Sequence, residues 1–162
     1  MEILTHPNPV LRQVAEDVDP STDRELSSLV SRMAKIMYDA PGVGLAAPQI
    51  GVQKRVIVFD VDEGLVAVCN PRIVERSDET VLDDEGCLSL PGIAVPVERS
   101  AHVVCEGLDL SGEPLRIEGT DLLARVLQHE TDHLDGVLII DRAGPDERKA
   151  AIRRYNEIAP VG

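Results

Sequence analysis

Apolar residues recur at helical spacing in the first quarter of the chain. They are Leu26, Leu29, Val30, Met33 and Met37, and they fall on one face of a helix. Residues with capping side chains at Pro20–Asp23 precede this run, and Ala40-Pro41-Gly42 follows it. The pattern predicts a helix that ends near Tyr38 and packs its apolar face on the core.

A second run of helical spacing extends from Asp121 to Leu134, with Thr120 as a candidate N-cap and Gly136 as a stop signal. One stripe of this helix is made by Leu122, Val126, His129 and His133. The two histidines therefore continue a face that we expect to be buried. Because an unpaired imidazole out of water costs free energy, a shared metal ion would satisfy both rings.

Shorter apolar runs between these helices predict strands at residues 54–59, 65–68 and 103–110, and residues 146–157 predict a C-terminal helix. Glycines, prolines and acidic residues between the runs predict turns. We expect an α+β fold in which small antiparallel or mixed sheets pack around the helix of residues 121–134. A length of 162 residues fits a single domain over residues 1–162.

The segment Gln128–His133 contains the motif HExxH. His129 and His133 project from one helical face, and Glu130 lies close enough to act on a water molecule beside a shared metal ion. The motif is short, so a chance match with two solvated histidines is the alternative interpretation. A third ligand would decide between a metal site and a chance match, because catalytic metals usually have three protein ligands and one open position.

Cys87 is the best candidate for that third ligand. It lies 42 residues before His129, in a segment over residues 84–92 whose glycines and prolines are typical of a loop. Cys69 and Cys105 lie in strand-like apolar runs, where a thiol usually behaves as a small buried hydrophobe.

Three motifs, taken in order, resemble the signature motifs of the peptide deformylase family. They are GVGLAAPQ at Gly42–Gln49, EGCLS at Glu85–Ser89 and QHETDHLDG at Gln128–Gly136. The resemblance spans nearly the whole chain, from Ile3–Arg12 to the terminal helix. It implies a bacterial, cytoplasmic, metal-dependent hydrolase that removes the formyl group from the starting methionine of nascent chains and releases formate.

The resemblance also implies a metal centre. Cys87, His129 and His133 would bind the ion and leave one position for water or the formyl oxygen. Ferrous iron is the implied native metal, with nickel or cobalt as active substitutes and zinc often poorly active. The thiolate and two imidazoles would also hold zinc well, so the sequence leaves the metal open.

Catalytic roles follow from the same resemblance. Glu130 would take a proton from water and later pass it to the leaving amine. The side-chain amide of Gln49 and the backbone N–H of Leu88 would donate to the oxygen on which negative charge develops.

Substrate contacts are expected at the first two motifs and on the metal-binding helix. Gly42 and Gly44 would allow the backbone of an extended peptide to approach closely, with plain turn geometry after Pro41 as the alternative. Gly86 is a further expected substrate contact. Val43, Leu122 and Val126 are candidates for an apolar methionine slot, with ordinary core packing as the alternative.

Two further positions extend the comparison with the family. Glu85 and Arg99 match recurring family positions, and we expect them to pair and brace the Cys87 loop. Many family members have an arginine seven residues after the metal-binding cysteine, but this chain has Ala94. Peptide contacts beyond methionine therefore stay open.

Composition excludes several classes of protein. With 29 acidic and 16 basic residues and a formal net charge of −13, most of the surface should repel nucleic acid, so no sequence-specific binding is expected. The chain has two tyrosines, one phenylalanine and no tryptophan, too few rings for a base-stacking platform. Three cysteines without a signal-like start, and no apolar run of membrane-spanning length, favour the cytoplasm and no membrane insertion.

The end of the chain is locally basic, with Arg148, Lys149, Arg153 and Arg154 in the predicted terminal helix. A solvated helix face is the default interpretation of such a charge run. Since the family acts on chains leaving the ribosome, docking of this helix on the ribosome is the alternative.

Two other functions share parts of this pattern. A zinc endopeptidase would share HExxH, but it normally takes a carboxylate or a further histidine as its third ligand. A non-catalytic peptide-binding homologue should lack a metal ligand or Glu130, and this chain keeps both.

Overall fold

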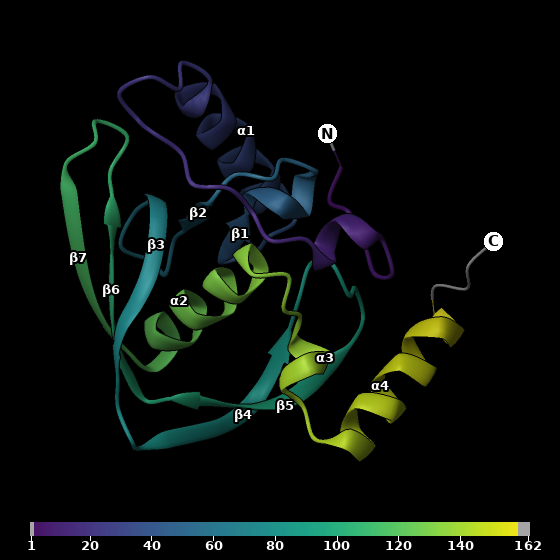
Figure 1. The fold of residues 1–162 in the computed structure, drawn as a ribbon. Coiled ribbons are helices and arrows are strands. Elements are labelled where there is room, and N and C mark those ends of the chain that lie inside the picture. Colours follow the sequence, from purple (N-terminus) through teal and green to yellow (C-terminus); the bar gives the residue numbers. More distant parts are fainter. Residues whose placement is uncertain (1, 159–162) are drawn as a thin grey trace.

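The structure, a computed structural model, describes residues 2–158 (Figure 1). Within this range, antiparallel strands form a five-stranded sheet in the order β1-β2-β3-β6-β7 and a two-stranded sheet of β4 and β5. The strands are β1 Gly44–Ala46, β2 Val56–Phe59, β3 Val66–Arg76, β4 Thr80–Gly86, β5 Ala94–Ser100, β6 His102–Leu108 and β7 Pro114–Thr120. The helices are α1 Leu26–Asp39, α2 Asp121–Leu134, α3 Ile139–Arg142 and α4 Pro145–Ile158, with 3-10 turns η1 Pro9–Arg12 and η2 Ala47–Ile50.

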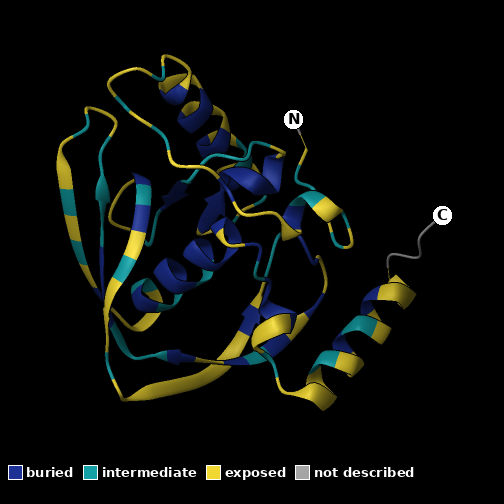
Figure 2. Cartoon of the chain, viewed as in Figure 1, coloured by how far each residue is buried: buried dark blue, intermediate teal, exposed yellow. Residues whose placement is uncertain are grey.

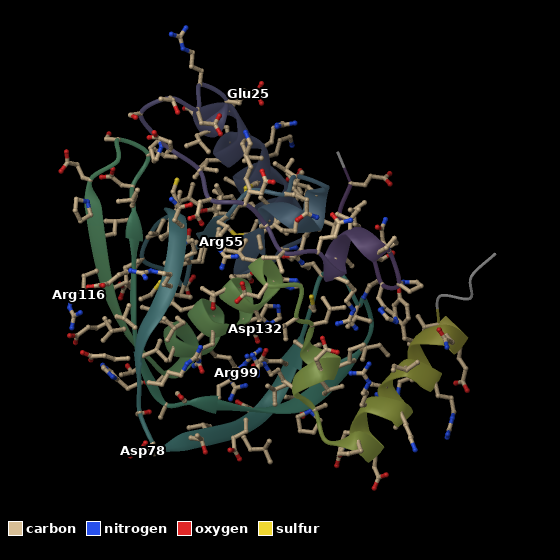
Figure 3. All side chains as sticks on the ribbon, in the orientation of Figure 1. Glu25, Arg55, Asp78, Arg99, Arg116 and Asp132 are labelled. Carbon is tan, nitrogen blue, oxygen red and sulfur yellow. The ribbon has the colours of Figure 1, made fainter. Side chains whose placement is uncertain are left out.

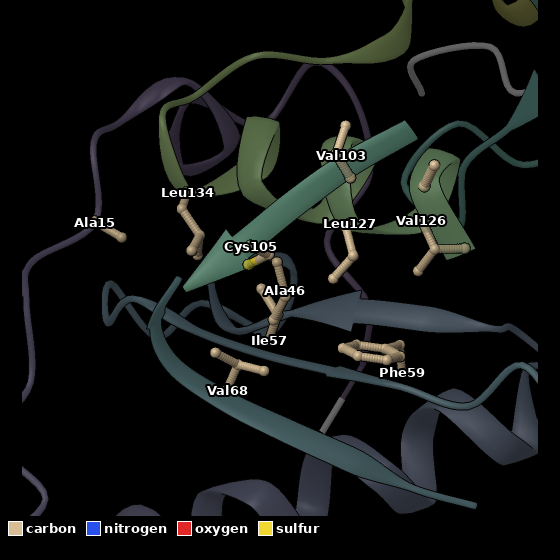
Figure 4. Packing of buried hydrophobic residues seen from close by; sticks show 11 residues of the cluster. Ala15, Ala46, Ile57, Phe59, Val68, Val103, Cys105, Val126, Leu127 and Leu134 are labelled. Atoms are coloured by element: carbon tan, nitrogen blue, oxygen red, sulfur yellow. The ribbon is translucent and has the colours of Figure 1, made fainter. Parts of the chain in front are cut away.

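Helix α2 lies between the two sheets and contacts strands of both (Figure 1). It is the most continuously buried helix in Figure 2. Its side chains Val126, Leu127 and Leu134 pack against strand residues such as Ile57 and Phe59 (Figure 4). The expected α+β fold is therefore confirmed.

The apolar face expected before residue 40 is also confirmed, because all five of its residues are buried in α1. The helix begins at Leu26, and the capping side chains before it do not cap it. Asp23 instead accepts a bond from the Glu25 N–H and pairs with Lys54.

The strand predictions were incomplete. The expected strand at 65–68 is the start of β3, which continues to Arg76, while β1, β4, β5 and β7 were not predicted. Strand β4 is exposed along most of its length and β7 alternates weakly, so neither carries the apolar pattern of a buried strand. The supposed loop at 84–92 therefore begins as the end of β4.

The ends of α2 differ in how well they were predicted. Thr120 holds the N-cap position, but its side chain makes no capping hydrogen bond. Gly136 lies just beyond the helix with φ +73°, and a Cβ there would lie 2.5 Å from the carbonyl oxygen of Arg12. The predicted stop at Gly136 is confirmed, because only glycine avoids this contact.

The helices found between residues 2 and 158 include none with the length and apolar character needed to cross a membrane.

Candidate active site

The turn after β4 brings Cys87 to the two histidines of α2. His133 Nε2 lies 3.3 Å from Cys87 Sγ and 3.2 Å from His129 Nε2. In the part of the chain that the structure describes, these residues are the one cluster whose ligand atoms could hold a metal, all within 4.8 Å of one another. Ligands bonded at 2.0–2.3 Å to one tetrahedral ion lie roughly 3.3–3.7 Å apart, so the trio fits a metal.

The electrostatics of the trio also suit a metal. Burial alone would raise the pKa of the Cys87 thiol, but the neighbouring His133 and His129 hold it well below its ordinary value. The Ser89 N–H lies 3.4 Å from the same sulfur and further favours the thiolate. The thiolate is the form of cysteine that binds metals.

Glu85 orients His129. Its Oε1 lies 2.8 Å from His129 Nδ1, which leaves the Nε2 of that ring facing His133 and Cys87. Arg99 donates two bonds to the same carboxylate, at 2.8 and 2.9 Å, so the predicted pairing of Glu85 with Arg99 is confirmed. The partner of a ligand histidine fixes its tautomer and the direction of its free nitrogen.

The sequence analysis did not predict the remaining ion pairs of Arg99 and Glu85. Arg99 donates at 2.6 Å to Asp132, which also accepts two bonds from Arg142. Figure 3 shows Arg99 and Asp132 between α2 and the β4–β5 sheet. Arg125 donates at 2.5 Å to Glu85 and to the carbonyl oxygens of Val81 and Val97.

Helical spacing could have indicated Arg125. It lies four residues before His129, on the same face of α2, so a partner shared with that histidine was foreseeable. Asp132 is different, because its partners Arg99 and Arg142 are distant in sequence and only the fold brings them together.

Glu130 is buried beside the metal cluster. Its Oε1 has no hydrogen-bond partner among the described residues. Burial raises the pKa of its carboxyl above the ordinary value, an effect that the charges of His129 and His133 partly oppose. A Cβ on Gly44 would lie 2.5 Å from Glu130 Oε2, so only glycine at position 44 leaves room for this carboxylate.

Gln49 is held in one orientation by hydrogen bonds at both ends of its amide. Its Oε1 accepts from the Ala46 N–H at 2.9 Å, and its Nε2 donates to Ser89 Oγ at 3.1 Å. The same Nε2 lies 3.8 Å from Cys87 Sγ, so the donor end of the amide faces the metal cluster.

The start of the chain joins the first two motifs. The Leu4 N–H donates to the Gln49 carbonyl at 2.7 Å, and the His6 N–H donates to the Ser89 carbonyl at 2.8 Å. The Tyr155 hydroxyl of α4 then donates to the His6 carbonyl at 2.9 Å. Both loops of the site are therefore fixed by backbone contacts.

A cavity of about 680 Å³ opens onto the cluster. Its lining includes the expected Val43, Gly44, Gln49, Gly86, Cys87, Leu88, Leu122, Val126, His129 and Glu130. His133 is buried and is not part of the lining.

The three residues expected in a methionine slot differ in exposure. Val43 is 43% and Leu122 51% exposed at the cavity wall, so the expectation of a buried stripe was wrong at Leu122, which lies on the first turn of α2. Val126 is 4% exposed and belongs to the core as well as to the cavity wall.

The chain is similar to known proteins over most of its length. A family model described as polypeptide deformylase matches residues 1–149. The peptide deformylase of Acidothermus cellulolyticus is 53% identical over 155 residues, which are 96% of this chain and 85% of that protein.

Solved structures are similar over almost the whole chain. The crystal structure of a peptide deformylase from Legionella pneumophila has a TM-score of 0.91 and 41% identity, covering 97% of this chain and 94% of that one. The crystal structure of a peptide deformylase from Synechococcus elongatus in complex with actinonin has a TM-score of 0.90 and 38% identity, covering 96% of this chain and 86% of that one.

Proposed function

The chain belongs to the polypeptide deformylase family, and on this basis we propose that Glu130 carries the proton during hydrolysis of the formyl group. The protein is a peptide deformylase that removes the N-formyl group from nascent polypeptides. The observation that best supports the role of Glu130 is its buried Oε1, which has no hydrogen-bond partner within residues 2–158 and lies beside the cluster of Cys87, His129 and His133.

Cys87, His129 and His133 would hold one divalent metal. When bound there, the ion supplies Lewis acidity, which lowers the pKa of water and polarises a carbonyl oxygen. We propose ferrous iron as the native metal, with nickel, cobalt or zinc as substitutes, in line with the family resemblance.

Glu130 takes a proton from the attacking water through its free carboxylate oxygen, and the water oxygen adds to the formyl carbon. When the C–N bond breaks, its electron pair goes to the nitrogen. Glu130 returns the proton to that nitrogen, and the products are formate and a free amino group. A carboxylate whose pKa is raised by burial is suited to both proton transfers.

Gln49 and the backbone N–H of Leu88 stabilise the oxygen on which charge develops. The bonds from Ala46 and to Ser89 hold the Gln49 amide before substrate arrives, so little reorganisation is needed during the reaction. One N–H of Nε2 is used by Ser89, and the other can face the substrate.

Val43, Leu122 and Val126 receive the methionine side chain. All three line the same cavity, and their aliphatic surfaces match an unbranched thioether. Gly44 and Gly86 leave the backbone accessible to the peptide main chain.

Formate release from a formyl-methionyl peptide tests this proposal. Protein purified without oxygen and loaded with ferrous iron or nickel should turn over, and Glu130→Gln should lose about 10²–10⁴-fold in rate while keeping its metal. Undiminished turnover by a metal-replete Glu130→Gln protein would contradict the proposal. Cleavage of unformylated peptides would instead identify an endopeptidase.

Exposure to air tests the metal assignment. A ferrous site with a thiolate ligand should lose activity in air as Cys87 is oxidised, whereas nickel-loaded protein should persist longer. If the iron-loaded protein kept its activity in air, and the mass of the peptide that contains Cys87 did not change, the expected oxidation would be contradicted.

We further propose that the protein works in the cytoplasm, where α4 docks on the ribosome. Ala151 and Tyr155 bury one side of this helix against the body of the protein, while Lys149, Arg153 and Arg154 are exposed on it. Changing these three basic residues to glutamate should abolish cosedimentation with ribosomes. Lys35→Glu, a charge reversal at an exposed position of α1, is the control, and retained binding by the triple variant would contradict the docking.

A further inference from the structure

Arg125 joins the two elements that carry the metal ligands. It lies on α2, four residues and about one helical turn before His129. Its guanidinium donates at 2.5 Å to Glu85 Oε2, and Glu85 lies on β4, two residues before Cys87. The contact between Arg125 and Glu85 is therefore close in sequence to a metal ligand on each side.

The same guanidinium also binds the backbone of the two-stranded sheet. The nitrogen that reaches Glu85, Nη1, donates to the Val97 carbonyl of β5 at 2.9 Å, and Nη2 donates to the Val81 carbonyl of β4 at 2.8 Å. A sheet of two strands has little stability of its own and needs packing against another element. These bonds fix both strands of the β4–β5 sheet to α2.

Arg99 holds the same carboxylate from a different side. It lies on β5, binds Glu85 within the β4–β5 sheet and shares its charge with Asp132 of α2. Arg125 reaches Glu85 from the helix, with a side chain that is 13% exposed. Because Arg99 still compensates the charge of Glu85 when Arg125 is replaced, a variant of Arg125 leaves no unpaired buried carboxylate, and we expect it to fold.

We propose that Arg125 is a positioning residue of the metal centre and sets the place of the Cys87 thiolate relative to the two histidines. His129 and His133 share one helix, so α2 fixes their spacing. Cys87 comes from another element, and its position depends on how β4 is held against that helix. The inference rests on the proposed metal site but not on the proposed reaction, so it can be tested without turnover.

The absorption spectrum of cobalt-loaded protein tests this, because it reports the sulfur ligand separately. Ligation by a thiolate gives a charge-transfer band in the near ultraviolet, and the visible bands report the coordination geometry. In Arg125→Met the charge-transfer band should shift and weaken relative to the wild type. The affinity for cobalt, measured in competition with a chelator on protein shown to be folded by circular dichroism, should fall about tenfold.

Two further variants separate position from charge. Arg125→Lys keeps the positive charge, but one ammonium nitrogen cannot reach Glu85 and both strand carbonyls at once. Its cobalt spectrum and affinity should therefore resemble those of Arg125→Met. Arg116→Met is the control, since it removes a guanidinium that pairs with Glu106 at 3.5 Å on β7, at the edge of the five-stranded sheet (Figure 3). This control should match the wild type.

The outcomes separate this inference from the proposed function. An unchanged sulfur band and affinity in Arg125→Met overturn the positioning role, and the proposed function stands. Full recovery by Arg125→Lys overturns it too, because charge alone would then suffice, and this variant decides if Arg125→Met does not fold. If cobalt bound to the wild type shows no sulfur band, the proposed metal site fails, and this inference fails with it.

Discussion

Among single residues, Glu85 contacts a metal-ligand histidine and two arginines, and it stands on the strand that leads to Cys87. Burial by itself raises the pKa of Glu85, but the bonds from Arg99 and His129 outweigh burial and hold it below the ordinary value. The carboxylate therefore stays ionised at neutral pH and keeps His129 in the tautomer that presents Nε2 to a metal.

Glu85→Gln should lower metal affinity about 10–100-fold, because an amide fixes the ring of His129 less firmly than a carboxylate does. Competition with a chelator, on protein shown to be folded by circular dichroism, measures the affinity. Glu79→Gln, the same change at an exposed position of the β3–β4 connection, is the control. Equal metal affinity in the wild type and in Glu85→Gln would show that Glu85 does not orient His129 for metal binding.

The two strand cysteines predict a pH dependence of stability. Burial raises the pKa of Cys69 and of Cys105 from an ordinary value of 9.0 to about 11. Between these values the unfolded thiols lose their protons while the folded thiols keep them, so this contribution is complete below pH 9 and is lost toward pH 11.

Urea unfolding at pH 8 and at pH 11 checks this expectation. Between pH 8 and pH 11, the free energy of unfolding of the wild type should fall by about 2–3 kcal/mol per thiol more than that of a Cys69→Ala, Cys105→Ala double variant. Equal losses of unfolding free energy in the two proteins would show that burial does not raise the pKa of these thiols.

Among the elements, α2 depends on its C-terminal turn. Gly136 has positive φ and leaves no space for a Cβ beside the Arg12 carbonyl, whereas Gly64 has positive φ in open space. Gly64→Ala should cost about 1 kcal/mol of unfolding free energy, and Gly136→Ala about 3 kcal/mol or more. Similar losses for the two variants in urea would show that Arg12 moves aside easily.

Elements that pack one apolar face on the core were predictable, and elements held by backbone pairing were not. The faces of α1 and α2 are visible in sequence because burial repeats every three to four residues. Strand β4 is held by its ladder to β5, and its exposed residues reveal nothing of this pairing.

Some residues of the site could also be predicted from the sequence, and others could not. The grouping of Cys87, His129 and His133 could be predicted because the two histidines of HExxH call for a third ligand, and Cys87 is the cysteine outside the apolar runs. The partners of Asp132 and the tie between Leu4 and Gln49 join segments far apart in sequence, so they depend on the completed tertiary structure.

At the scale of the whole molecule, the metal centre spans the boundary between the two sheets. Cys87 follows β4, while His129 and His133 lie on α2, which packs against both sheets. We therefore expect residues 1–162 to unfold as a single domain, stabilised by any ion that binds only the folded form.

Thermal unfolding followed by circular dichroism and by calorimetry checks both expectations. One transition should be seen, and metal at a hundred times its Kd should add about 2.7 kcal/mol of stability relative to chelated protein. Two separate transitions would indicate that the β4–β5 sheet with α4 unfolds independently of the rest.

The order of the metal ligands along the chain has a consequence for how the enzyme matures. At translation rates of about 5–20 residues per second, Cys87 is made roughly 2–8 s before His129, which lies 42 residues later. During that interval its thiol lacks the imidazoles that complete the ligand set. We therefore expect the ion to be acquired only after His133 has been made, because the ligand set is incomplete until then.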